Sequence, residues 1–383
     1  MYPDFHLPTK IYAQPGIIDS IGEIISAEGA NRALIITSSD DFEKYESRIE
    51  DIIAKLNQSD VISIVYDEIP GTTNNEYIDS AVYYAKKTKA DIIIGIGRIE
   101  SLNSAKAIAL LANNYFFCED IFEYPKTDRP IPFALVPFIP CFGLEILPCF
   151  FIPDIHENIK RIYYNYTMYP SLTIIDPTLA IIADDEETSQ MGIAALSLSV
   201  ESLISQKASE FSNTYALKSI DLTFQNLTRA FREPDNPRYR TPLALASLLS
   251  GIAMSTAFMS VCFSLALSLS SYTQIPLSTG MCIILPHIME YNLTTSTGKY
   301  VQIAKVMDEN VREITVIEAA IKAVEAIRKV TSDIDIPQRL SEYEVSKTLF
   351  NKISSVALTY PFIKHSPRTL SRDELETILI AAF

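Results

Sequence analysis

Five short runs of β-branched and other apolar residues, separated by longer stretches, constrain the fold of the first half of the chain. The runs are 32–37, 61–66, 91–97, 133–137 and 172–176. They do not alternate between apolar and polar residues, which is typical of parallel strands with helices on both faces. Helical patterns at 42–58, 74–88 and 101–113 lie between the earlier runs. This order predicts βαβ units and a doubly wound α/β sheet.

The second half of the chain has a different character. From about residue 186 onward nearly every segment has the length and period of a helix. We therefore predict a dinucleotide-binding-like α/β domain at 1–182 and an all-helical domain at 183–383. The stretch 241–289 contains no Asp, Glu, Lys or Arg, and its first part is long enough for a membrane span of about 20 residues. Its many serines, set between large apolar residues, favour a buried core helix instead.

The charge balance argues against two classes of partner. Lys and Arg number 32 against 47 Asp and Glu, a net charge of −15. Nucleic-acid grooves and anionic membrane surfaces both need clustered cations, so we expect the chain to bind neither. The cysteines are odd in number and form no CxxC pair, which is typical of reduced thiols; they are Cys118, Cys141, Cys149, Cys262 and Cys282. No export signal is visible at 1–8, and we expect a cytoplasmic protein.

Several motifs occur in the order and spacing of a known family. Residues 95–109 lie over the pattern GGGSxxDxAKxIA, and residues 136–145 lie over PTTAGTGSE. Residues 191–205 resemble GMDALTHAIEAYVS, and residues 285–292 are close to LPHVMEYN. In this respect the chain resembles the iron-containing (group III) alcohol dehydrogenases along its whole length. The resemblance implies that family's fold, which is of the dehydroquinate synthase-like type: a dinucleotide-binding domain followed by a helical domain.

The resemblance places the family's metal site on apolar residues. Family members hold iron or zinc with one Asp and three His, and the matching positions are Ala194, Leu198, Phe263 and Leu277. A further active-site His of the family falls on Leu267. A divalent cation needs N, O or S donors at about 2.0–2.3 Å, and these side chains offer none. We therefore expect no metal ion, and we expect these side chains to pack together as hydrophobic core.

The segment that would face the pyrophosphate of NAD(P) is altered too. The family's Gly-Gly-Gly-Ser becomes Gly97, Arg98, Ile99 and Glu100, whose Cβ atoms restrict φ and fill space. Glu100 would act as the anion of the following helix and repel a phosphate. Arg98 could instead pair with a phosphate of the cofactor, although an arginine that lies at the surface or pairs with Glu100 is favoured. The remnant cofactor positions implied by the resemblance are Gly95, Gly97, Arg98, Glu100, Ser101, Asn103, Lys106 and Gly143.

These observations support one prediction and leave two alternatives open. We predict a pseudoenzyme of this family that binds a partner subunit or a small molecule in the interdomain cleft, with no NAD(P), iron or zinc. The partner would be a second copy or an active paralogue, because family members commonly associate through the N-terminal domain. The first alternative is an active NAD(P)-dependent alcohol or aldehyde oxidoreductase with altered or no metal. The second is a nucleotide-binding sensor that holds its ligand beside Arg98 and Lys106.

Overall fold

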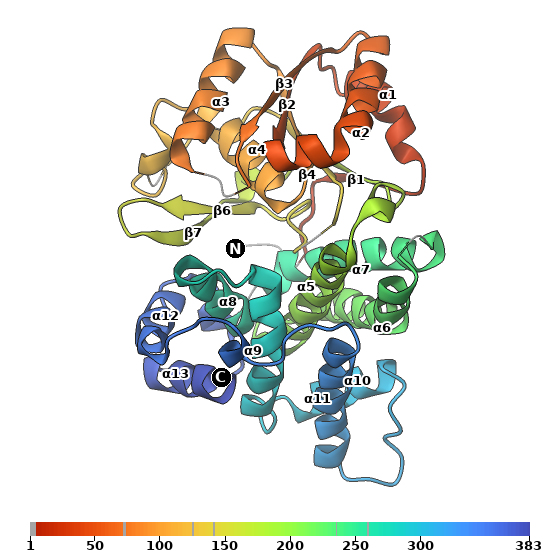
Figure 1. Ribbon diagram of the computed structural model, residues 1–383, viewed down its shortest axis with the longest axis vertical. Coiled ribbons are helices and arrows are strands. Elements are labelled where there is room, and N and C mark those ends of the chain that lie inside the picture. The colour runs from red at the N-terminus through yellow and green to blue at the C-terminus, as the bar shows by residue number, and fades with distance from the viewer. Residues whose placement is uncertain (1–4, 72–73, 125, 141, 235, 259) are drawn as a thin grey trace. The chain divides into compact units, whose positions relative to one another are not determined.

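The computed structural model describes residues 5–71, 74–124, 126–140, 142–234, 236–258 and 260–383. The chain forms two compact units (Figure 1), one of residues 7–180 and one of residues 181–383 together with residues 5 and 6. The division therefore lies two residues before the position expected from the sequence. Phe5 belongs with the second unit because its ring stacks on that of Phe211, with the centroids 5.6 Å apart.

A six-stranded parallel sheet forms the centre of the 7–180 unit. Its strands, in order across the sheet, are β1 (Lys10–Ala13), β8 (Leu172–Ile175), β5 (Phe133–Pro137), β4 (Ile92–Gly97), β2 (Arg32–Ser38) and β3 (Ile62–Ile69). All five predicted runs are strands of this sheet, which confirms the α/β prediction. Strand β1 was not predicted, because its four residues at the sheet edge are too short a run for a periodic signal.

The direction of winding in this sheet reverses beside β2. Strand β3 pairs with one side of β2 and β4 pairs with the other, so that Ile35 lies opposite both Val65 and Ile94. In open α/β sheets, ligands bind beyond the carboxyl ends of the strands where the winding reverses. The carboxyl ends of β2 and β4 are therefore the place in this unit where the fold itself favours a binding site.

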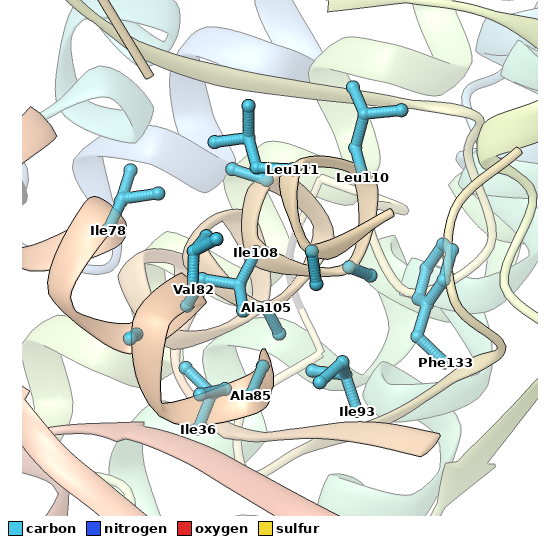
Figure 2. Packing of buried hydrophobic residues seen from close by; sticks show 14 of the residues in the cluster. Ile36, Ile78, Val82, Ala85, Ile93, Ala105, Ile108, Leu110, Leu111 and Phe133 are labelled. Carbon is cyan, nitrogen blue, oxygen red and sulfur yellow. The ribbon is translucent and has the colours of Figure 1, made fainter. Parts of the chain in front are cut away.

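Four helices cover the sheet, namely α1 (Ile21–Ala27), α2 (Ser39–Gln58), α3 (Asn75–Thr88) and α4 (Ile99–Ala112). Helix α1 packs against α2, and α3 packs against α4. Figure 1 shows α1 and α3 on opposite sides of β2 and β3. Figure 2 shows part of the resulting core, in which Ile78 and Val82 of α3 and Ile108 of α4 belong to one cluster with the strand residues Ile36 and Ile93.

The chain forms an unpredicted antiparallel hairpin in the segment that connects β5 to β8 in the sequence. Its strands are β6 (Cys149–Asp154) and β7 (Ile159–Tyr164). Asp154 closes the turn, since its carboxylate accepts hydrogen bonds from the N–H groups of His156 (2.9 Å) and Glu157 (3.2 Å). The same carboxylate pairs with Arg161 at 2.8 Å. Asp154, His156 and Glu157 therefore form the turn of the hairpin.

The second unit is helical, as predicted. Its helices are α5 (Asp185–Ile204), α6 (Glu210–Arg232), α7 (Pro237–Ala257), α8 (Val261–Tyr272), α9 (Leu277–Tyr291), α10 (Thr297–Val306), α11 (Val316–Ser332), α12 (Phe350–Ala357) and α13 (Arg372–Ala381). Helix α5 contacts α6, α7, α8 and α9, and its residues are buried along most of its length. It begins with a capping box in which Asp184 and Glu187 each accept the other's backbone N–H.

Short 3₁₀ helices occur in both units, at Ile17–Ser20, Cys118–Asp120, Tyr166–Met168, Leu179–Ile182, Leu340–Glu342, Lys347–Leu349 and Ile363–His365. The charge-free stretch of the sequence forms most of α7, all of α8 and most of α9. Within the described ranges, no single helix is both long and apolar enough to cross a membrane, and α7 and α8 meet that criterion only as a pair bent by 105°.

We expect close packing at Gly192 of α5 to be sensitive to a single methyl group. A Cβ atom at Gly192 would lie 2.4 Å from Cδ1 and 2.9 Å from Cγ of the buried Leu227, so Gly192→Ala should destabilise the protein by about 1–3 kcal/mol. Gly298→Ala in α10 is the matched control, because a Cβ there meets nothing within 4 Å; it should be neutral or stabilising by about 0.5–1 kcal/mol. Urea denaturation measures both, and equal effects would contradict the packing.

Candidate functional site

A buried carboxylate joins the carboxyl ends of β2 and β4. Asp41, in the first turn of α2, accepts hydrogen bonds from the backbone N–H of Arg98 at 2.8 Å and from the hydroxyl of Ser101 at 2.6 Å. The guanidinium of Arg98 also pairs with this carboxylate. The Asp41 side chain has no exposed surface, whereas that of Arg98 is 32% exposed. A buried carboxylate needs such donors to offset the loss of its hydration.

Two serines complete this arrangement. The Ser38 hydroxyl caps α2 by accepting the Asp41 N–H at 3.1 Å, and the Ser38 N–H donates to the hydroxyl of Ser101 at 2.8 Å. The resemblance described above implies an acidic residue after this strand, and Ser38 lies near that position. In the structure the acidic residue at the carboxyl end of β2 is Asp41, three positions after Ser38. Its carboxylate accepts hydrogen bonds from Arg98 and Ser101.

Two glycines in β4 lie so close to neighbouring side chains that neither leaves room for a Cβ atom. Gly97 has φ +135°, which favours glycine, and a Cβ atom there would lie 2.2 Å from Oδ2 of Asp41. A Cβ atom on Gly95 would lie 2.6 Å from the Cβ of Ala105 in α4. The two glycines therefore allow a carboxylate and a helix of this chain to approach the strand.

The sequence favours an Arg98 that lies at the surface or pairs with Glu100, and in the structure Arg98 is partly exposed and pairs with Asp41. Glu100, in the first turn of α4, has its pKa raised to about 7, first by burial and then by the charge of Asp41, while its own backbone N–H, Lys160 and Arg98 oppose the rise. A second acidic group therefore lies close to the start of α4, which is unfavourable for a phosphate.

The other remnant cofactor positions have structural partners. Lys106 is fully buried, and its ammonium donates to the carbonyl oxygens of Leu144, Leu147 and Cys149 at 2.5, 2.7 and 2.8 Å. Burial lowers its pKa to about 8, which leaves the group protonated at neutral pH. Asn103 accepts the N–H of Phe151 at 3.1 Å.

The turn at Gly143 is part of the same arrangement. Gly143 has φ +64°, and its carbonyl accepts the N–H groups of Ile146 and Leu147 at 3.0 Å each. Lys106 thus holds the turn that follows β5, and its ammonium is directed at protein carbonyls. Cys141 of the same motif lies outside the described residues.

In the helical unit, the positions that the resemblance matches to the family's metal ligands are buried. Ala194 and Leu198 of α5 have no exposed surface, Phe263 of α8 is 1% exposed, and Leu277 of α9 is 9% exposed. Leu267, one turn after Phe263, is fully buried. The three helices pack on one another. Within the described ranges, no group of three or more His, Cys, Asp and Glu side chains could hold a metal ion.

A second buried carboxylate lies beside these positions. Glu201 of α5 is 1% exposed and caps α8, because its oxygens accept the backbone N–H groups of Cys262 at 2.7 Å, Phe263 at 3.2 Å and Ser260 at 3.4 Å. Burial raises the pKa of Glu201 to about 7, and the backbone donors oppose the rise. The Glu201 carboxylate therefore caps the N-terminus of α8.

Sequence reasoning did not single out Asp41 or Glu201. Glu201 was visible only as the one acidic residue in a stretch that is otherwise apolar or hydroxyl-bearing from Met191 to Ser205, a pattern that points to burial. Asp41 was hidden among neighbouring acids at the start of α2, where acidic residues are common.

Comparison with known proteins is consistent with this fold. Residues 8–177 match the family model described as "Iron-containing alcohol dehydrogenase", and residues 188–383 match "Fe-containing alcohol dehydrogenase family, C-terminal". The chain belongs to the iron-containing alcohol dehydrogenase family. Among its relatives, the 1,3-propanediol dehydrogenase of Klebsiella pneumoniae is 25% identical over 99% of this chain and 98% of its own length. The choline dehydrogenase of Bacillus subtilis is 24% identical over 96% and 92%.

Solved structures share the same architecture. A 1,3-propanediol oxidoreductase superimposes with a TM-score of 0.94 at 24% identity, over the full length of both chains. An alcohol dehydrogenase from Oenococcus oeni superimposes with a TM-score of 0.95 at 22% identity, also over both full lengths. At this level of identity the likeness establishes the fold.

The residues of this chain do not fit the groups that the family implies. The four ligand positions carry hydrocarbon side chains, which cannot donate an electron pair to iron or zinc. At the start of α4 the space in front of Gly97 is taken by the Asp41 carboxylate, and Glu100 adds further acidity where a diphosphate would need donors.

We expect the stability of the protein to fall as the pH rises through the titration of Glu201. The folded-state pKa of about 7 lies above the unfolded value of 4.5, so the folded state keeps a proton that the unfolded state releases. This contribution, about 3 kcal/mol, is complete below pH 4.5 and is lost as the pH rises through 7. Glu201→Gln should lack it, while the exposed control Glu325→Gln should behave as the wild type. Urea denaturation at pH 5 and pH 8 measures this, and parallel wild-type and Glu201→Gln profiles would refute it.

Proposed function

We propose that this chain is a pseudoenzyme of the iron-containing alcohol dehydrogenase family, which keeps the fold, lacks metal-dependent hydride transfer and acts by binding. Its ligand would be a second copy of the chain, an active paralogue or a small molecule. One observation carries the proposal: each of the four positions that match the family's metal ligands bears a buried apolar side chain.

The chemistry of these positions supports a loss of function rather than a change of metal. Replacing one ligand would weaken a metal site, whereas Ala194, Leu198, Phe263 and Leu277 together leave no donor set. A metal ion buried among hydrocarbon groups would lose its hydration without replacement, which costs far more than a folded protein can offset. Glu201, the nearest acid in the sequence pattern, already accepts three backbone N–H groups.

An NAD(P)-dependent alcohol or aldehyde oxidoreductase is the second candidate, and a specific observation favours it. The curated relatives are dehydrogenases by name, including the NAD-dependent methanol dehydrogenase of Bacillus methanolicus, which is 21% identical over 98% of both chains. The comparisons by themselves therefore favour this second candidate. It would require a protein group to polarise the alcohol oxygen in place of the metal, a role normally worth several kcal/mol.

Metal content and cofactor binding distinguish the two candidates. We expect protein purified after expression with added Fe²⁺ or Zn²⁺ to hold far less than one metal ion per chain by elemental analysis. We also expect no NADH binding by fluorescence titration and no oxidation of 1,3-propanediol, ethanol or propanol. The Klebsiella pneumoniae 1,3-propanediol dehydrogenase, prepared in the same way, is the positive control. Stoichiometric metal with micromolar NADH binding would establish the oxidoreductase instead.

We expect Leu198 to behave as a packed core residue. Leu198→Ala should destabilise the protein by about 2–5 kcal/mol, because the side chain has no exposed surface and its removal leaves a cavity. Leu245→Ala in α7 is the control, since Leu245 is 41% exposed and should cost less than about 1 kcal/mol. Urea denaturation gives both values. A Leu198→Ala cost as small as that of the control would indicate an unfilled, solvated site and would count against the proposal.

A further inference from the structure

Asp41 occupies the place where a sheet of this topology receives its ligand. The winding reverses between β2 and β4, and Asp41 follows β2 while Arg98 and Ser101 follow β4. At such a switch point the carboxyl ends of two strands lie beside the start of a helix, whose free N–H groups can bind an anion. In this chain the anion at the switch point is the carboxylate of Asp41.

The donors around Asp41 are those that bind phosphate oxygens in proteins. A backbone N–H (Arg98), a hydroxyl (Ser101) and a guanidinium (Arg98) converge on its two carboxylate oxygens. A guanidinium binds carboxylate and phosphate with the same planar geometry. The carboxylate also approaches Gly97 so closely that a Cβ atom there would meet Oδ2 at 2.2 Å.

A simple cap of α2 does not explain this arrangement. The first turn of α2 is already capped by the Ser38 hydroxyl, which accepts the Asp41 N–H. Asp40, its neighbour, has the same charge and the same proximity to the start of α2 but is exposed to solvent. The Asp41 side chain instead turns toward residues 57 and 60 positions further along the chain, at the start of α4.

We propose that Asp41 is a built-in ligand, whose carboxylate takes the position of a phosphate at the β2–β4 switch point and so closes this site to nucleotides. The inference deepens the proposed function, because it gives the loss of cofactor binding a separate cause from the loss of the metal. Removing the carboxylate leaves Arg98 and Ser101 directed at a space that a diphosphate can fill.

The test is replacement of the internal anion by a free one. Asp41→Ala and the more conservative Asp41→Asn should be less stable than the wild type, and inorganic pyrophosphate should restore part of that stability. We expect millimolar pyrophosphate to raise the melting temperature of Asp41→Ala by about 2 °C more than that of the wild type. Asp40→Ala is the matched control, since it removes the same charge one residue away and should respond as the wild type does.

Each outcome of this experiment is informative. If Asp41→Ala is unfolded alone and folds when pyrophosphate is added, the inference is supported in its strongest form. If it stays unfolded at every pyrophosphate concentration, or is folded and responds no more than Asp40→Ala, the inference is wrong. ADP-ribose serves as a second probe, and stabilisation of Asp41→Ala but not of the wild type by this nucleotide also supports it. Neither readout depends on metal or on hydride transfer, so a failure of this inference is distinguishable from the presence of a metal ion or of dehydrogenase activity.

Discussion

Burial of a carboxylate is the constraint on which both units of this protein depend. An unpaired buried charge costs several kcal/mol, so such a group persists only where donors surround it. Asp41 meets this condition at the start of α4, and Glu201 meets it at the start of α8. In both places the carboxylate comes from a different helix than the one it caps. The acids therefore connect helices within each unit.

These interactions are accommodated without a change of fold. The TM-scores of 0.94 and 0.95 to dehydrogenase structures show that the architecture tolerates this set of substitutions. Hydrocarbon side chains at the ligand positions add to the core of the helical unit, and Lys106 organises the turn after β5 through three carbonyl groups. Groups of this kind stabilise the folded chain, and proteins commonly trade such stability against the strained or open arrangements that catalysis needs.

The sequence was sufficient to predict most of the architecture and part of the site. The five central strands were visible because each is a β-branched run with no polar alternation, and the helical half was visible from its period. The edge strand β1 and the β6–β7 hairpin were not predicted, because four residues carry little pattern and because the segment 154–157 does not indicate which strands it joins. The partners of Arg98 and Lys106 were also missed, since local spacing says nothing about which distant group a long side chain meets.

What the sequence alone determined is the chemistry available: strands of a buried parallel sheet, a helical half, and no electron-pair donors at Ala194, Leu198, Phe263 and Leu277. These follow from side-chain type and period, which are local properties. Only the tertiary structure decided which acid meets which donor. Asp41 and Arg98 are 57 positions apart, and Glu201 and Cys262 are 61 apart. Asp41 and Arg98 meet because parallel strands end on the same side of a sheet, and Glu201 and Cys262 meet because α5 and α8 pack together. Neither condition can be deduced from the local sequence.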